Sequence, residues 1–198
     1  MINVYKYEGI DEEDCLTKCI EELDVYSCDL LINQIEDDEE YKIEVVKKED
    51  ILAFIKDYFK NLISKMNLDV NLEIREEENI FNVTIVSNNN PILIGKDGKN
   101  LNSLQFLIRQ TLKNLTSFDI KVNLDISNYR AKKVKNFEYQ IKNIVREVQK
   151  TKTDTKLDPM NSYQRRIIHS LLSDFSNVTT ESVGEEPNRC VVIKYIGD

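Results

Sequence analysis

The sequence lacks several features that would assign it to a class at once. No apolar run approaches the roughly 18 residues that a membrane-spanning helix requires. The first residues show no basic segment followed by an apolar stretch, so we expect no secretory signal. With 41% apolar and 31% charged residues, the 198-residue chain is neither fibrous nor disordered in composition. We therefore expect a cytoplasmic protein without membrane insertion, built as one large domain or two to three small ones.

Metal-binding and disulfide patterns are missing as well. The cysteines Cys15, Cys19, Cys28 and Cys190 form no Cys-x-x-Cys pair, and the single histidine, His169, is distant in sequence from three of them. The pattern does not favour a zinc site. Cys15 and Cys19 have the spacing of one helix face, where reduced thiols pack as small apolar side chains. We expect no metal and no cofactor.

The net charge of −8 is spread unevenly along the chain. Residues 1–50 carry 17 acidic and 5 basic side chains, a net charge of −12, whereas residues 126–198 carry 9 and 13, a net charge of +4. Between residues 95 and 156, 14 basic side chains stand against 6 acidic ones. This local excess of positive charge has the sign needed to attract phosphate, and the changes in charge also suggest domain boundaries.

Residues 1–50 have the pattern of a small β-α-β unit. Every residue from 36 to 40 is acidic, and we interpret residues 36–50 as a linker or an edge strand. The expected elements before them are an alternating strand over 2–7, a helix over 11–23 and a second strand from residue 30.

From residue 50 the pattern becomes that of a long amphipathic helix followed by a mixed segment. The predicted order is helix, strand, strand, short helix, glycine turn, helix, strand. The corresponding ranges are 51–66, 70–74, 80–86, 91–94, 95–98, 101–115 and 118–124.

The glycine turn, Gly95 to Gly98, is the most informative motif of the chain. Two glycines three residues apart remove side chains from a helix-to-helix junction, so that backbone N–H groups can approach a ligand closely. A nucleotide-binding P-loop would need glycine at position 93 and Ser or Thr at position 100, where the chain has Leu93 and Asn100. A calcium loop with its glycine at position 98 would begin at Leu93, which is no ligand. An ordinary turn remains the alternative.

The order of elements around this turn resembles a KH domain of type II. The resemblance implies that the loop holds the sugar-phosphate backbone of single-stranded RNA, or single-stranded DNA, while an adjoining apolar groove accepts bases. It implies that Gly95 and Gly98 let the nucleic-acid backbone approach the protein backbone closely, and that Lys96 and Lys99 supply positive charge. The loop residues assigned to binding are Ile94, Gly95, Lys96, Asp97, Gly98 and Lys99.

One residue of the loop departs from the family pattern. Asp97 places a carboxylate near the expected phosphate, where repulsion should reduce affinity. We expect that changing Gly98 to Asp impairs RNA binding while the fold stays intact.

The helix predicted over residues 129–150 has one basic face. Taking Ile141 as the centre of its apolar stripe, five basic side chains and no acidic one of this helix fall in the sector from about 100° to 180°. A solvated face and a face that follows phosphates both fit this pattern, and a neighbouring KH loop favours the second. The five residues are Lys132, Lys135, Lys142, Arg146 and Lys150.

A second motif, Arg165 and His169 four residues apart on a helix with Asn161 as its expected N-cap, lies near the C-terminus. Arg-x-x-x-His, followed by the hairpin expected over 180–195, resembles the R-3-H domain. The resemblance implies that both side chains bind the backbone of single-stranded nucleic acid, with Arg166 and Arg189 as helpers. A histidine that only satisfies a nearby polar group is the alternative. A metal-free ribonuclease needs a second acid-base group beside the histidine, so we expect no enzyme.

Together these motifs resemble the Jag family, also called the KhpB or SpoIIIJ-associated family. The resemblance implies an α+β fold of three small units in series: a β-α-β N-terminal unit (1–50), a type II KH domain (51–126) and an R-3-H domain (127–198). It implies a bacterial cytoplasmic RNA-binding regulator, linked in some members to cell elongation or sporulation, with a small single-KH protein as a partner.

A protein-interaction scaffold is the competing class. The acidic residues 1–50 would then recruit a basic partner or shield the protein's own basic surface, and the KH domain would serve homodimerisation. Deleting residues 1–50 is expected to separate these hypotheses, since tighter RNA binding would indicate shielding.

Overall fold

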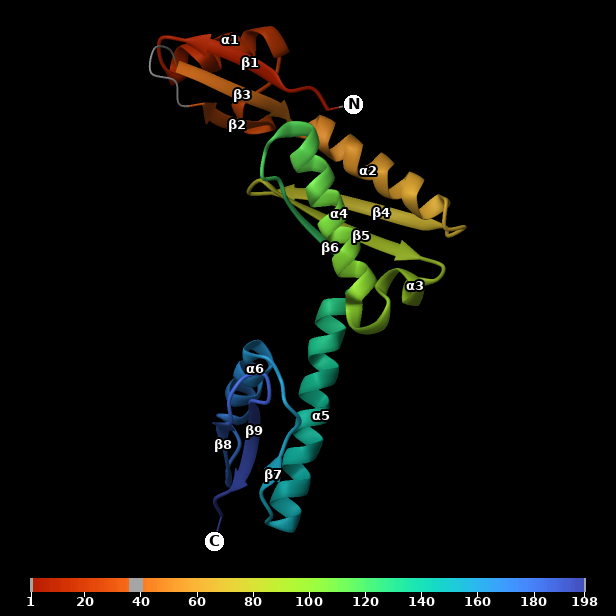
Figure 1. Cartoon of the computed structure of the whole chain (residues 1–198), viewed down its shortest axis with the longest axis vertical. Coiled ribbons are helices and arrows are strands. Elements are labelled where there is room, and N and C mark those ends of the chain that lie inside the picture. Colours follow the sequence, from red (N-terminus) through yellow and green to blue (C-terminus); the bar gives the residue numbers. More distant parts are fainter. Residues whose placement is uncertain (1, 36–40, 198) are drawn as a thin grey trace. The chain divides into compact units, whose positions relative to one another are not determined.

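The computed structural model describes residues 2–35 and 41–197 (Figure 1). Its contacts divide the chain into two compact units, Met1–Tyr129 and Arg130–Asp198. Helices and three three-stranded sheets build an α+β fold, as the sequence predicted. Within the described ranges, no helix combines the length and the apolar character needed to cross a membrane.

The first unit begins with an antiparallel sheet in the order β1-β3-β2, crossed by helix α1. The interpretation of residues 36–50 as a linker or edge strand is wrong for residues 41–50, because residues 48–50 begin a helix and residues 41–47 form the central strand, β3. Consecutive apolar residues explain this position, because Val45 and Val46 are buried on opposite faces of the sheet, in different clusters. Residues 36–40 lie outside the described residues. The elements are β1 (Tyr5–Gly9), α1 (Glu12–Leu23), β2 (Leu30–Ile35) and β3 (Tyr41–Lys47).

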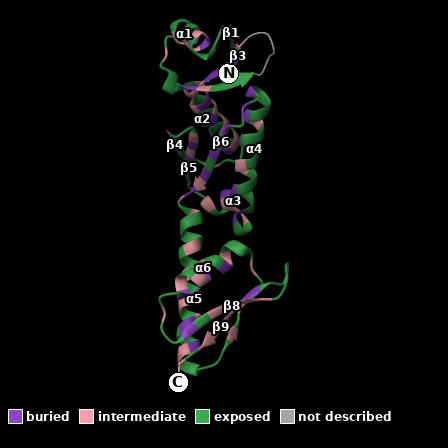
Figure 2. Cartoon of the chain, turned by 90° about the vertical axis from the view of Figure 1, so that its left-hand side faces the viewer, coloured by how far each residue is buried: buried purple, intermediate pink, exposed green. Residues whose placement is uncertain are grey.

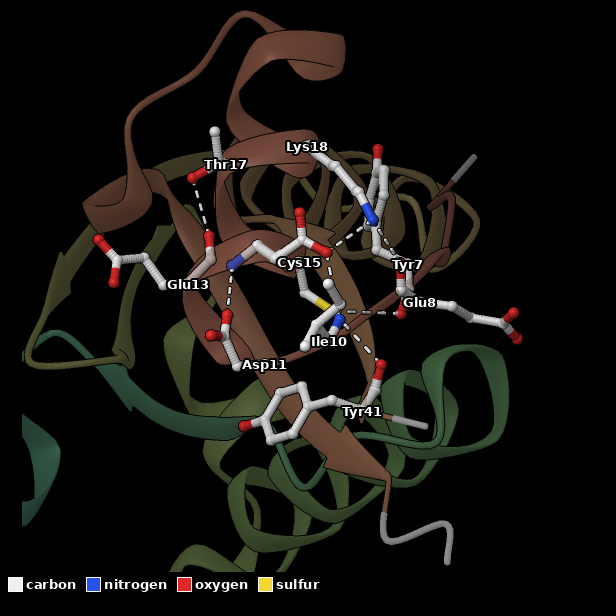
Figure 3. Close-up of polar contacts among 10 residues, drawn as sticks. Tyr7, Glu8, Ile10, Asp11, Glu13, Cys15, Thr17, Lys18 and Tyr41 are labelled. Carbon is white, nitrogen blue, oxygen red and sulfur yellow. Dashed lines mark hydrogen bonds and ion pairs between the residues drawn. The ribbon is translucent and has the colours of Figure 1, made fainter. Parts of the chain in front are cut away.

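Local hydrogen bonds fix the start of α1 against the sheet (Figure 3). The Asp14 N–H donates to the N-cap side chain of Asp11 at 2.8 Å, and Lys18 forms an ion pair with Asp14 at 2.8 Å. The Cys15 thiol donates to the carbonyl oxygen of Tyr41 at 3.4 Å. Burial raises the pKa of Cys15, so this thiol stays protonated and serves as a small core side chain.

The second part of the first unit has the predicted order of elements. Strands β4 and β5 are antiparallel, β5 and β6 are parallel, and helices α2 and α4 cover one face of this sheet (Figure 1). Element ends differ from the predicted ends by up to three residues. The elements are α2 (Lys48–Ser64), β4 (Val70–Glu77), β5 (Ile80–Ser87), α3 (Asn90–Ile94), the 3-10 turn η2 (Lys96–Gly98), α4 (Lys99–Thr116) and β6 (Lys121–Ile126).

The N-terminal sheet shares apolar contacts with this second part. Val46 and Ile51 are both fully buried in one cluster, and Ile2 and Leu31 pack against it. A cut after residue 50 would therefore expose apolar surface, so the proposed deletion of residues 1–50 would change packing as well as charge. The division into three domains stays a prediction.

The second unit packs two helices against an antiparallel sheet in the order β7-β9-β8. The predicted N-cap is confirmed: Asn161 accepts from the Gln164 N–H at 2.9 Å, in a reciprocal capping box. Ile168, Val191 and Ile193 are among the buried residues of its core. The elements are α5 (Tyr129–Thr151), β7 (Thr155–Lys156), α6 (Ser162–Leu172), β8 (Val178–Val183) and β9 (Cys190–Tyr195).

Candidate nucleic-acid interface

The glycine turn connects α3 to α4 through backbone conformations that favour glycine. Gly95 has φ of 70° and ψ of 179°, and Gly98 has φ of 86° and ψ of 16°. The Gly95 N–H donates to the carbonyl oxygen of Pro91 at 2.9 Å, which ends α3. The first residue of α4, Lys99, follows directly. The chain thus passes from α3 to α4 within four residues, with only two side chains between the glycines.

Close packing around both glycines also opposes a side chain. A Cβ atom on Gly98 would lie 2.9 Å from the ring of Tyr129, and one on Gly95 would lie 2.6 Å from the side chain of Asn100. The positive φ and the tyrosine ring both oppose a side chain at position 98, so the structure argues against the expectation that Gly98→Asp leaves the fold intact, which stays a prediction.

The charged residues of the turn are accessible. Lys96, Asp97 and Lys99 are exposed, whereas Ile94 is half-buried. Asp97 has φ of 58°, in the left-handed region, so the turn holds its backbone in a conformation that Asp and Asn tolerate better than most residues. The side chains of both lysines lack a hydrogen-bond or ion-pair partner within the part of the chain that the structure describes. They can therefore meet a phosphate without giving up another contact.

The sequence did not identify Asn100 as part of this turn. Its side-chain Nδ2 donates to the carbonyl oxygen of Ile92 at 2.8 Å, which ties the start of α4 to α3. Ile92, Leu93, Asn100, Ser103 and Leu104 also line a cavity of about 180 Å³ together with Met66. An amide two residues after the last glycine of the Gly-x-x-Gly turn is the signal in the sequence that points to this role.

Another flank of α4 closes the exposed edge of β6. The Leu124 N–H donates to Gln105 Oε1 at 3.1 Å, and Arg109 Nε donates to the carbonyl oxygen of Val122 at 2.8 Å. Because β6 is an edge strand of its sheet, these side chains occupy backbone groups that another strand would otherwise pair with. The sequence pattern of α4 gave no indication of these bonds.

The predicted basic face of α5 is exposed in the second unit. Lys132, Lys135, Arg146 and Lys150 are exposed and Lys142 is half-buried. The buried positions of the helix begin only at residue 141, and Figure 2 shows them in its C-terminal half. The N-terminal half of α5 therefore offers its lysines to solvent.

Arg165 is placed differently from a surface arginine. Its side chain is only 8% exposed, and its Nη2 donates to Glu186 Oε1 at 2.6 Å. Glu186 lies in the connection between β8 and β9 and is 65% exposed. Among the described residues, Arg165 is the only charged side chain that is buried. Sequence spacing gave no sign of this pairing.

His169 lies one helical turn after Arg165 and contacts strand β8. Its Nδ1 is 2.6 Å from Thr180 Oγ1, and its Nε2 is 2.9 Å from Ser182 Oγ. A neutral imidazole donates through one nitrogen and accepts through the other, and hydroxyl groups can serve both. His169 is half-buried, so these contacts favour the structural alternative, in which the ring joins α6 to β8.

The remaining residues predicted to bind nucleic acid are Arg166 and Arg189. Arg166 and Arg189 are exposed, one beside Arg165 on α6 and the other just before β9. The residues from Ile94 to Lys99 form one continuous turn in the first unit, and the other predicted residues belong to the second unit. Within the described ranges, no group of three or more His, Cys, Asp or Glu side chains is arranged to hold a metal ion.

These features define a class of protein that carries a KH fold followed by an R-3-H fold. Residues 53–126 match the family model described as "KhpA/KhpB, KH domain", and residues 135–195 match that of the R-3-H domain. The RNA-binding protein KhpB of Clostridium symbiosum is 38% identical over 153 residues, which cover 76% of this chain and 69% of that protein.

Two further relatives carry the same name. The RNA-binding protein KhpB of Bacillus subtilis is 30% identical over 155 residues, covering 77% of this chain and 74% of that protein. That of Lactiplantibacillus plantarum is 28% identical over 137 residues, covering 69% of this chain but only 42% of that longer protein. The chain belongs to the KhpB family.

Proposed function

We propose that this protein is a cytoplasmic regulator that binds single-stranded RNA and has no enzymatic activity. The observation that carries the proposal is the turn between α3 and α4, where Gly95 and Gly98 have positive φ and Lys96 and Lys99 are exposed. Relatives named RNA-binding protein KhpB support it. So do the matches to two domain families, one of which, the KH domain, uses such a loop to hold nucleic-acid backbone.

The glycine turn acts as a backbone clamp in this proposal. Lys96 and Lys99 attract phosphates, and the glycines let the strand approach the chain closely. Asp97 reduces the affinity by repulsion, so the turn alone is neither tight nor selective.

The second unit supplies the other contacts. The exposed basic side chains of α5 bind phosphates along the strand, and Arg165, Arg166 and Arg189 form a second contact point. His169 holds β8 in position through its two hydroxyl partners. Two weak sites on one protein chain bind the same RNA more tightly than either site alone, because binding at one site raises the effective concentration of RNA at the other. Because lysine and arginine dominate both sites, binding depends strongly on salt concentration.

Fluorescence anisotropy with a labelled single-stranded RNA tests the proposal. The double variant Lys96→Gln/Lys99→Gln should bind more weakly than the parent protein and show a smaller salt dependence. The control, Lys56→Gln/Lys60→Gln, removes the same charge from exposed positions of α2 and should match the parent. Equal affinity of both variants, or affinity that stays flat from low to high salt, would contradict the proposal. Incubation with the RNA should leave its length unchanged.

A protein-interaction scaffold is the second candidate function. Helix α4 carries Phe106, Leu107 and Leu115 at 65%, 47% and 52% exposure, and exposed apolar groups of this size favour a protein contact. A second copy of the chain or a small single-KH protein would cover them. Light scattering should then show a dimer that Phe106→Ser converts to monomer. A parent protein that is monomeric alone and with such a partner would exclude this function.

A further inference from the structure

The guanidinium of Arg165 holds an anion with only part of its binding edge. Nη2 contacts Glu186 Oε1 at 2.6 Å, whereas Nε is buried and has no hydrogen-bond partner within the described residues. Nε and Nη2 form one edge of the planar guanidinium, which fits two oxygens of a carboxylate or phosphate at once. A buried donor without a partner costs free energy. The edge is therefore built for an anion that fills it better than Glu186 does.

The two partners of this ion pair differ in their freedom to move. The Arg165 side chain is 8% exposed, so it cannot leave its place without moving α6 or the hairpin. The Glu186 side chain is 65% exposed and lies in the β8–β9 connection, so water can hydrate its carboxylate when another anion takes its place on Arg165. Any exchange at this site thus replaces the carboxylate and leaves the arginine in position.

We propose that Glu186 is an exchangeable internal anion, and that a phosphate group displaces it from the Nε/Nη2 edge of Arg165. The inference deepens the proposed RNA binding and rests on it for the identity of the phosphate as a backbone diester. Exchange of one anion for another keeps the buried arginine neutralised. Arg166 follows Arg165 directly and Arg189 comes three residues after Glu186. Both are exposed, so their charges attract the incoming RNA strand. Glu186 therefore lowers the affinity of this site and rejects weak anions.

The variant Glu186→Gln tests the exchange because the amide keeps a hydrogen-bond acceptor but loses the charge. Its control is Glu185→Gln, which changes the net charge equally at an exposed neighbour that forms no hydrogen bond or ion pair with Arg165 within the described residues. In anisotropy titrations, Glu186→Gln should bind single-stranded RNA about fivefold more tightly than the control. The gain should vanish when Arg165→Met is added. Equal affinity of the two single variants, or weaker binding by a folded Glu186→Gln, would overturn the proposal.

A second measurement separates this proposal from RNA binding itself. The Nε–H signal of Arg165 in a ¹⁵N–¹H spectrum should shift when inorganic phosphate is added to Glu186→Gln, and less in the parent protein. If RNA fails to bind while phosphate moves this signal, the anion site stands and the proposed RNA function fails. If RNA binds to the parent without moving the Arg165 signal, RNA binding stands and the exchange is refuted. The parent protein alone gives this second result, so it holds even where Glu186→Gln does not fold.

Discussion

The glycine turn and the Arg165 region present positive charge in opposite ways. At the turn, the side chains of Lys96 and Lys99 are exposed and lack partners within the described residues. At α6, Arg165 is buried and paired with Glu186, and His169 bonds two hydroxyl groups. An exposed lysine stays hydrated until a phosphate arrives, whereas a buried guanidinium requires an anion from the start.

Because of this difference, substitutions in the two regions should affect RNA affinity and protein stability differently. Removing a lysine of the turn takes away a charge that the fold does not use, so only ligand binding should change. Changing Arg165, Glu186 or His169 also alters contacts that join α6 to the hairpin, so stability should change with binding. Substitution of a cation that we propose to meet phosphate should therefore have different consequences in the two units.

The largest expected effect is a loss of stability in Gly98→Asp, which would show that the glycine turn supports the fold as well as ligand binding. Gly98→Asp should lower the free energy of unfolding by about 2–4 kcal/mol, because positive φ and the Tyr129 ring both oppose a side chain. Urea denaturation measures this change. Asp97→Asn is the control, since asparagine tolerates the left-handed backbone. Parent-like stability of Gly98→Asp would show that the turn relaxes freely.

His169→Ala tests whether the second region is held together by its polar contacts. We expect a loss of about 1–2 kcal/mol, because Thr180 and Ser182 both lose a hydrogen-bond partner. RNA affinity of the folded variant should stay within about twofold of the parent, since hydrogen bonds already occupy both ring nitrogens. Thermal unfolding and anisotropy measure the two quantities, with the exposed Ser170→Ala as control. A stable variant that no longer binds RNA would make His169 a direct contact.

The lysines of the turn should change binding alone. Each of Lys96→Gln and Lys99→Gln should reduce the slope of log affinity against log salt by about one. The stability of both variants should stay within about 0.5 kcal/mol of the parent. Salt titrations and urea denaturation of the same samples measure both effects. If either variant lost stability while the salt dependence of its RNA affinity stayed unchanged, the lysines of the turn would serve the fold, as Arg165 and His169 do.

The smallest effect concerns the carboxylate of the turn. Asp97→Asn should raise RNA affinity about twofold by removing repulsion at an exposed, screened position. The gain should shrink as salt rises. Weaker binding by this variant would mean that Asp97 supports the shape of the turn more than it repels phosphate.

Much of the fold was predictable from residue periodicity. The order of elements from α2 to β6, the long helix α5 with its basic face, and the capped helix α6 follow the sequence patterns. The central position of β3 was not predictable, because neighbours distant in the chain decide which strand lies in the middle. Charged residues on both sides of Val45 and Val46 gave this segment the pattern of a linker or an edge strand, although the two valines are buried on opposite faces of the sheet.

The sequence by itself determined the two motifs, their helices and the distribution of charge, since each depends on spacing within one segment. Only the tertiary structure decided what the motif residues contact. It placed the Tyr129 ring against Gly98, Glu186 on Arg165 from 21 residues further along the chain, and two hydroxyl groups on His169. The physical reason is that burial and pairing depend on atoms contributed by other segments, which no local pattern records.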